Sequence, residues 1–202
     1  VISICVLINS YKFISNENYQ RKFRYSIFLN IFISSMVLFS LSDDLLSSFI
    51  FWEFLGLCSF FLIAYYNSDV KAIYSSTMAF WITRFGDLFF LMGLIIIYLG
   101  SQSLSISSIN NFLINSNNYS DNLALFFILI GIFTKCAQYP FTIWLPRAMK
   151  GPTPVSALIH SATMVVAGIF LLFKLSSSIE FYPFIKDTIF YAVSYTHLRA
   201  HE

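Results

Sequence analysis

Charged residues are scarce in this chain. Only 11% of its 202 residues are Asp, Glu, Lys or Arg, whereas 57% are hydrophobic and 19% are aromatic. Soluble domains carry about 25% charged residues, so this composition excludes an ordinary soluble fold and indicates a polytopic membrane protein. The net charge of +2 is too small for a nucleic-acid-binding surface. We therefore expect a lipid bilayer around the chain and no nucleic acid partner.

Cysteine is also rare, and Cys5, Cys58 and Cys136 lie in apolar segments without metal-ligand spacing. This pattern predicts small hydrophobic side chains in packed helices, not disulfides or zinc ligands. The sequence also lacks a phosphate-binding glycine loop, a redox CxxC motif, a haem-ligand pair and a nucleophile–base pair. We expect no covalent chemistry and no bound cofactor or metal in this chain. Since it has neither an initiator Met nor a signal peptide, we expect an internal fragment of a longer protein.

Runs of about 20 apolar residues, the length that crosses a bilayer as a helix, recur along residues 1–193. They predict an all-α fold, a transmembrane bundle of about six spans. The expected elements are a stub at Val1–Ser10, spans at Tyr25–Ser42, Leu45–Tyr66, Thr77–Leu99, Asn122–Leu145 and Thr153–Leu175, and a last span that starts near Tyr182. We expect a short surface helix in the long loop Ser101–Asp121.

Basic residues gather on one side of the membrane if these spans alternate in direction. The loops of that side hold Lys12, Arg21, Lys22, Arg24, Lys71, Arg147 and Lys150, whereas those of the other side hold only Lys174 and Lys186. The positive-inside rule therefore predicts that the first side faces the cytoplasm or the mitochondrial matrix.

The last residues, SYTHLRAHE, break abruptly with the apolar composition before them. We interpret residues 194–202 as a non-native tail that resembles a translated sequencing adapter. His197 and His201 have the i, i+4 spacing of a helical metal site. In a tail of this kind, however, we do not expect them to bind metal.

Five ionisable residues fall within the expected spans: Glu53, Arg84, Asp87, Lys135 and His160. A charge at the bilayer centre costs about 2.5–3.5 kcal/mol on insertion scales, so each is a candidate functional residue. Glu53 is either a protonated acid that bonds to a neighbouring helix, or a carboxylate in a hydrated interior that pairs with a cation on another helix. Gly56, one turn later, would let a neighbouring helix approach closely.

Arg84 and Asp87 are three residues apart and share a helix face. They are expected to form an ion pair within their helix that supports the span. The alternative is that the pair tunes Glu53 or a proton entry route.

Lys135 lies in the apolar run Leu123–Ala137, close before Pro140. The ring of Pro140 collides with the carbonyl of Cys136, which predicts a discontinuous helix near Lys135–Pro140 and a free carbonyl at that depth. A titratable amine beside such a break could load and release a proton as a counter-charge such as Glu53 moves. The alternative is a lysine that extends to the membrane interface, but Lys135 lies too deep for this.

His160 lies on the next span, where Ser156, His160, Thr163 and Ala167 are predicted to form a small polar stripe on one face. Histidine titrates near neutral pH and suits a proton relay. The alternative is a neutral histidine that bonds to a helix backbone.

A close resemblance to the antiporter-like membrane subunits of proton-pumping NADH:quinone oxidoreductase, respiratory complex I, is carried by KCAQYPFTIWLPRAMKGPTPVSALIHSATMVVAGIFLL (Lys135–Leu172). Two shorter segments resemble the subunit 5 branch more narrowly: FWEFLGLCSFFLIAYY (Phe51–Tyr66) and RFGDLFFLMG (Arg84–Gly93). Together the three segments cover most of Leu45–Leu175. Subunits of multi-subunit sodium/proton antiporters share the first signature and are the alternative.

The resemblance implies a role for each buried charge. Glu53 matches the essential mid-membrane glutamate of the family, and Lys135 matches the proton-carrying lysine at a helix break. His160 matches a histidine that passes protons along the central axis. Asp87 matches a modulating aspartate, with Arg84 in a supporting role. The family fold consists of two inverted repeats, of which Tyr25–Leu175 would be the first.

The implied function is that of a proton-translocating subunit of an enzyme complex, in which quinone reduction drives proton pumping. Other membrane subunits would be its partners, and NADH, FMN, iron–sulfur clusters and quinone would bind on other subunits. Heavy use of Phe (24 residues) and Tyr (12 residues), with much Ile, Asn and Ser, is typical of an A+T-rich organelle gene. We therefore expect a multi-pass protein of the mitochondrial inner membrane, with the bacterial plasma membrane as the alternative.

Overall fold

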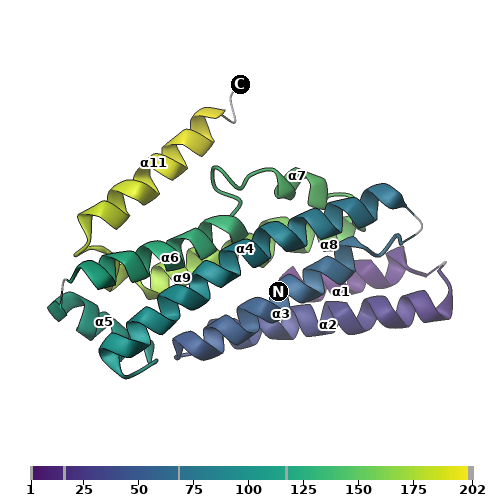
Figure 1. The fold of residues 1–202 in the computed structure, drawn as a ribbon. Helices are drawn as coiled ribbons and strands as arrows, with labels where there is room; N and C mark the ends of the chain where they lie inside the picture. The colour runs from purple at the N-terminus through teal and green to yellow at the C-terminus, as the bar shows by residue number, and fades with distance from the viewer. Residues whose placement is uncertain (1, 16, 68, 117, 200–202) are drawn as a thin grey trace.

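The computed structural model describes residues 2–15, 17–67, 69–116 and 118–199, which form helices joined by short connections (Figure 1). The helices are α1 (Ile2–Phe13), α2 (Tyr19–Leu41), α3 (Leu45–Ile63), α4 (Val70–Ser101), α5 (Ile106–Ser116), α6 (Tyr119–Lys135), α7 (Trp144–Ala148), α8 (Thr153–Ala157), the π-helix η1 (Leu158–Ala162), α9 (Met164–Lys174), α10 (Ser176–Ile179) and α11 (Pro183–Arg199). No β-strand occurs within these ranges. The all-α prediction is confirmed.

Four helical stretches in the described ranges are long and apolar enough to cross a membrane. They are α2, α3, α4 and the continuous stretch Thr153–Lys174, which contains α8, η1 and α9. The other expected spans correspond to shorter helices: α1 has 12 residues, and α6 and α11 have 17 each. At 1.5 Å per residue, α6 is about 26 Å long. The chain is a multi-pass membrane protein, and α5 is the surface helix expected in the long loop.

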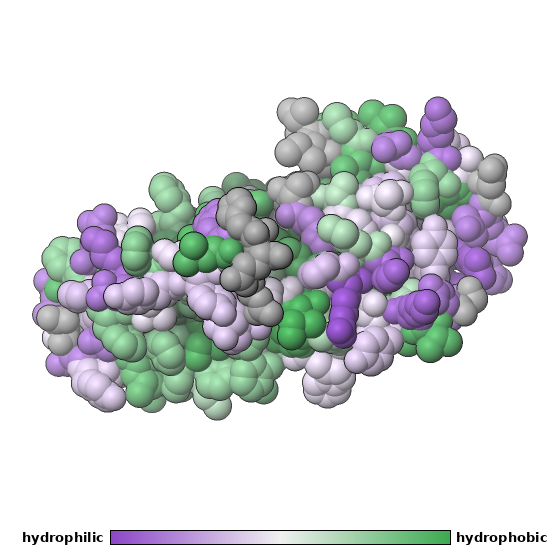
Figure 2. All heavy atoms as spheres, turned by 90° about the horizontal axis from the view of Figure 1, so that it is seen from above, coloured by the Kyte–Doolittle hydropathy of each residue, from purple (hydrophilic) through white to green (hydrophobic). Residues whose placement is uncertain are grey.

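The long helices bury small polar residues and expose apolar ones. Hydroxyl side chains at the helix contacts include Ser35, Ser48, Ser59, Ser76 and Thr83, all buried. Large apolar side chains on the same helices are exposed, among them Ile31, Leu38, Phe54, Trp81 and Leu88. Small residues let membrane helices approach closely, and apolar side chains suit contact with lipid tails. In Figure 2, hydrophilic side chains gather toward the ends of the elongated molecule.

Backbone hydrogen bonds join the helix ends at one end of the bundle. The Leu45 N–H donates to the Leu104 carbonyl at 2.8 Å, and the Ile106 N–H donates to the Asp43 carbonyl at 2.9 Å. At the same end, the Asn110 amide donates to the Lys174 carbonyl at 3.1 Å. The α2–α3, α4–α5 and α9–α10 connections therefore lie together, as alternating spans require.

The opposite end of the bundle carries the start of α2, the start of α4, and α7 (Figure 1). Arg147 of α7 lies there against Tyr74, with its guanidinium 6.0 Å from the ring centroid, and it donates to the Met78 sulfur. The basic loop residues therefore share one end of the bundle, which fits the predicted alternation. Which compartment this end faces stays a prediction.

The last helix, α11, continues through the predicted tail boundary to Arg199 and diverges from the bundle (Figure 1). The Thr196 hydroxyl donates to the Gln138 side chain at 2.9 Å. The interpretation of residues 194–202 as a non-native tail stays a prediction. His201 lies outside the described residues, and no cluster of three or more potential metal ligands occurs among those described.

Candidate functional site

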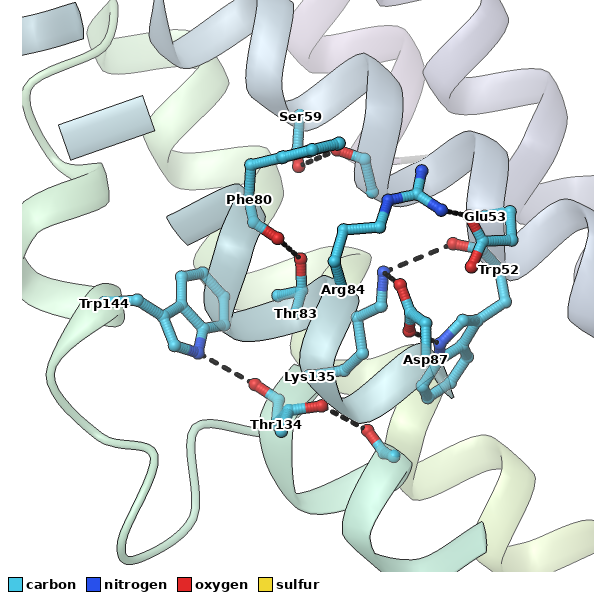
Figure 3. A network of polar contacts seen from close by, with 12 residues as sticks. Trp52, Glu53, Ser59, Phe80, Thr83, Arg84, Asp87, Thr134, Lys135 and Trp144 are labelled. Atoms are coloured by element: carbon cyan, nitrogen blue, oxygen red, sulfur yellow. Dashed lines mark hydrogen bonds and ion pairs between the residues drawn. The ribbon is translucent and has the colours of Figure 1, made fainter. Parts of the chain in front are cut away.

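Four charged side chains from three neighbouring helices meet inside the bundle (Figure 3). The Arg84 guanidinium of α4 contacts the Glu53 carboxylate of α3, and these side chains are 28% and 23% exposed. The Lys135 ammonium at the end of α6 lies 3.7 Å from the Asp87 carboxylate of α4, and these side chains are only 1% and 3% exposed. Because two cations face two anions, the quartet can be fully ionised with no net charge.

These pairs correct two predictions. Arg84 and Asp87 were expected to pair within their helix, but in the described structure neither is in ion-pair contact with the other. Glu53 was the expected counter-charge of Lys135, but that role falls to Asp87. The physical reason is that α4 packs against both α3 and α6. Each charge on α4 therefore finds its partner on a different neighbouring helix.

Lys135 is enclosed by Trp52 and Gly56 of α3 and by Asp87 of α4. Its ammonium donates to the Trp52 carbonyl at 3.3 Å and lies 5.3 Å from the centroid of the Trp52 ring. A Cβ atom added at Gly56 would lie 2.7 Å from the same nitrogen. Gly56 therefore makes room for an ammonium group, not for a helix backbone. The alternative of a lysine that extends to the interface is excluded by its burial.

Trp52 is a site residue that the sequence reasoning missed. Its side chain is fully buried, and its indole N–H donates to the second Asp87 oxygen at 2.6 Å. Asp87 therefore has an indole on one oxygen and an ammonium near the other. A signal was available, since Trp52 directly precedes Glu53 and a buried tryptophan usually finds an acceptor for its N–H.

The end of α6 supports Lys135. The Cys136 N–H donates to the Ile132 carbonyl and the Gln138 N–H to the Phe133 carbonyl, both at 2.9 Å, and Ala137 has a φ of 51°. This is a Schellman-type helix end with alanine in the left-handed position that glycine usually takes. The predicted discontinuity is confirmed. However, α6 ends before Cys136, so the break is a completed helix end and not a carbonyl freed by Pro140.

Trp144 of α7 is the second residue that was missed. Its indole N–H donates to the Thr134 carbonyl at 2.8 Å, directly beside Lys135 in the chain. The Thr134 hydroxyl donates to the Gly131 carbonyl at 2.7 Å. The Trp144–Thr134 hydrogen bond thus ties the start of α7 to the last turn of α6 (Figure 3). No spacing in the sequence indicated this contact.

His160 lies apart from the four charges. It falls in η1, and its buried Nε2 atom has no hydrogen-bond partner. The described structure contains no hydrogen bond or ion pair between His160 and the quartet. The expected polar stripe is interrupted, because the π-helix changes the residues per turn and Thr163 leaves helical geometry at φ −135°. The Thr163 hydroxyl donates instead to the Leu158 carbonyl at 2.9 Å.

The fold and the quartet together define a class of protein: a multi-pass helical membrane protein with alternating charges between its helices. Residues 42–200 match the family described as "NADH:quinone oxidoreductase/Mrp antiporter, TM". The chain belongs to this family.

Relatives from both branches of the family are similar to the chain. It is 38% identical to NAD(P)H-quinone oxidoreductase subunit 5, chloroplastic, of Mesostigma viride, over 93% of this chain and 29% of the relative. The chain is also 38% identical to NADH-quinone oxidoreductase subunit L of Buchnera aphidicola, over 89% of this chain and 29% of the relative. Antiporter subunit mnhA2 of Staphylococcus aureus (strain JH9) is 43% identical over 75% of this chain and 19% of the relative.

A solved structure agrees with this assignment. The Mrp complex from Dietzia sp. DQ12-45-1b contains a chain that aligns with a TM-score of 0.69 and 34% identity, over 74% of this chain and 16% of that one. The chain spans less than a third of the length of the quinone oxidoreductase subunits it matches.

Proposed function

We propose that this chain is the proton-transfer part of a membrane subunit of proton-pumping NADH:quinone oxidoreductase. The observation that carries the proposal is the buried Lys135–Asp87 pair at the end of α6, next to the Arg84–Glu53 pair. Ionisable groups inside a membrane bundle mark proton and ion paths, because their burial is costly and such residues are therefore rare where they serve no function. Glu53, Lys135 and His160 would carry protons, and Asp87 and Arg84 would support them.

The alternating charges supply a mechanism. Two charges 3.7 Å apart attract by roughly 4 kcal/mol at an effective dielectric constant of 20. An interaction of this size helps decide whether a buried amine keeps its proton. Arg84 lies one helical turn from Asp87. If Arg84 moved from Glu53 toward Asp87, Asp87 would hold the Lys135 ammonium less well, and Lys135 would release its proton toward the next acceptor.

His160 would be such an acceptor only after a rearrangement. Its buried Nε2 atom has no hydrogen-bond partner, and the described structure contains no hydrogen bond between His160 and Lys135. Water or a change in η1 would have to connect them. A π-turn is a frequent feature of functional sites, because it can shift a side chain without ending the helix.

The redox branch is favoured over the sodium/proton antiporter branch on two grounds. Matches to the quinone oxidoreductase subunits extend over 93% and 89% of the chain, against 75% for the antiporter subunit. The A+T-type composition also suits an organelle gene. The proposed location is therefore the mitochondrial inner membrane, in a complex whose other subunits hold NADH, FMN, iron–sulfur clusters and quinone.

The test uses the complete subunit in its assembled complex, reconstituted in vesicles. Lys135→Ala should abolish proton pumping and most of the coupled quinone reductase activity. Glu53→Gln should be nearly as damaging, and Glu53→Asp milder. Full retention of both activities in Lys135→Ala would overturn the proposal. NADH-independent, sodium-dependent proton exchange by the wild-type complex would instead assign the chain to the antiporter branch.

A further inference from the structure

A second cluster of polar groups surrounds a cavity at the basic end of the bundle, away from the quartet. The cavity lies between the start of α2 and the end of α3 and has a volume of about 270 Å³. Arg21, Arg24, Tyr25 and Tyr65 line it with polar groups, and phenylalanines of α2 and α3 form an apolar wall. It is thus cationic on one side and aromatic on the other.

The two arginines are not equally available. Arg21 is partly neutralised by Glu17, with its guanidinium 3.4 Å from the carboxylate. Arg24 makes no ion pair or hydrogen bond with any described residue and is exposed. Lys22 is turned to the Ser15 carbonyl, to which it donates at 2.6 Å. The cavity therefore has a net positive charge that the described part of the chain does not neutralise.

Two phenol groups at the cavity lack partners. Tyr25 is only 2% exposed, and neither its hydroxyl nor that of Tyr65 has a hydrogen-bond partner in the described structure. The Ser10 hydroxyl lies close to Tyr25 and donates to the Leu7 carbonyl at 2.8 Å. A buried polar group without a partner is destabilising, so a ligand that offers these hydroxyls an acceptor would be stabilised here.

The phenol of Tyr65, beyond the end of α3, keeps its proton and can act as a donor. Burial, and then the Glu17 carboxylate, raise the pKa of Tyr65, whereas Arg21 and Arg24 oppose the rise. The rings of Tyr25 and Tyr65 meet edge to face, with centroids 5.4 Å apart. This contact holds Tyr25 beside Tyr65 in the lining of the cavity, which also contains Arg21 and Arg24.

The apolar wall of the cavity is well ordered by stacking. The rings of Phe28 and Phe61 are nearly parallel, with centroids 4.5 Å apart. Phe61 is 42% exposed, on a face of α3 that would contact lipid. A free anion would gain nothing from this wall, whereas a hydrocarbon chain would be buried against it.

We propose that this cavity binds an anionic phospholipid from the inner leaflet. Its phosphodiester would accept hydrogen bonds from Arg24, Tyr25 and Tyr65, and one acyl chain would lie along Phe28 and Phe61. Basic pockets between transmembrane helices on the inner side are suited to anionic head groups, because that leaflet is rich in them. The site would join α2 to α3, and α3 carries Trp52 and Glu53 of the quartet.

The test is lipid binding by the purified complex that contains the complete subunit. After delipidation, the affinity for phosphatidylglycerol is measured for the wild type, Arg24→Gln and Tyr25→Phe. Arg24→Gln should weaken binding about tenfold, the loss of one charge-assisted hydrogen bond, and Tyr25→Phe about threefold. Lys71→Gln is the matched control, since it removes an exposed positive charge from the same end of the bundle but outside the cavity. It should bind like the wild type.

Two competing ligands and the Arg24→Gln variant make the outcome decisive, and assembly and thermal midpoint are compared to show that each variant folds. Equal affinity for phosphatidylcholine would mean a purely apolar groove and would overturn the proposal. Displacement of the lipid by millimolar inorganic phosphate would mean that the cavity is a simple anion site. Wild-type affinity in Arg24→Gln would mean that the lipid binds elsewhere on the complex. Either result would also overturn the proposal. None of these readouts depends on proton transport, so the lipid site and the proposed function stand or fall separately.

Discussion

The ammonium of Lys135 lies 3.7 Å from a carboxylate oxygen of Asp87, and both side chains are almost completely buried. Neither charge could remain in this interior alone, because an unpaired buried ion is strongly destabilising. The two helices that carry them, α6 and α4, pack along each other. The pair therefore links the packing of the bundle to the ionisation of a group that is proposed to carry protons.

Replacing one member of this pair should destabilise the subunit more than replacing both. Lys135→Met or Asp87→Asn alone leaves one charge unpaired and should cost about 3–5 kcal/mol. The double variant should cost less than the sum of the two by about 0.5–3 kcal/mol, the usual coupling between contacting residues. Thermal unfolding of the detergent-solubilised complex measures all three. Strictly additive losses would show that the two side chains do not interact.

Gly56→Ala should impair proton transport while the fold is kept. The new methyl group would lie 2.7 Å from the Lys135 nitrogen. That nitrogen is the end of a flexible side chain, so the amine would shift instead of the helix. Gly100→Ala is the matched control on α4, since its methyl group would meet only the end of the Phe112 ring, at 2.8 Å. Pumping assays should separate the two variants, and equal rates would contradict the proposed placement of the amine.

Trp52→Phe should bind Asp87 less tightly, because phenylalanine keeps an aromatic ring, although a smaller one, but lacks the N–H that donates at 2.6 Å. A hydrogen bond to a charged group contributes about 1.5–3 kcal/mol. We expect a lower thermal midpoint and slower proton pumping. Trp81→Phe on α4 is the control, because Trp81 is 72% exposed. If the Trp52 variant matched this control in both measurements, the indole would only fill space.

Ala137→Gly should stabilise the end of α6. Ala137 has a φ of 51°, a left-handed conformation in which a Cβ atom costs about 1–2 kcal/mol. Part of this gain is offset, because glycine loses more backbone entropy on folding. We expect a net gain below about 1 kcal/mol in the thermal unfolding assay.

Ala124→Gly, in the regular part of the same helix, provides the comparison. It should be destabilising by at least about 1 kcal/mol, because glycine has the lower helix propensity and the fully buried methyl group of Ala124 is lost. A gain in stability for Ala137→Gly and a loss for Ala124→Gly would support the left-handed helix end at Ala137. Destabilisation at both positions would contradict the left-handed conformation of Ala137.

The residues of the candidate site differ in whether the sequence alone could predict them. Glu53, Arg84, Asp87 and Lys135 stood out because each is a charge in an apolar run, and all four meet in the structure. Trp52 did not stand out, because tryptophan is ordinary in a membrane helix. Its role depends on Asp87, which is distant in the chain and close only after folding.

Local sequence patterns did not predict the backbone geometry at two helix irregularities, the end of α6 and the π-helix at His160. Pro140 correctly indicated a break near Lys135, but the Schellman-type end is completed by Gln138 and reinforced by Trp144. The π-turn at His160 had no signal in the sequence, since a polar stripe is read on the assumption of regular helix geometry. Such features follow from packing against other helices.

The sequence by itself determined the membrane class, most helix positions, the gathering of basic loop residues at one end of the bundle and the identity of the buried charges. These follow from hydropathy and from the cost of charge in lipid, which are properties of each segment alone. Only the tertiary structure decided that Arg84 pairs with Glu53 and Asp87 with Lys135. Ion pairing depends on which helix faces lie against each other, and in a bundle that is settled by side-chain packing between segments far apart in the chain.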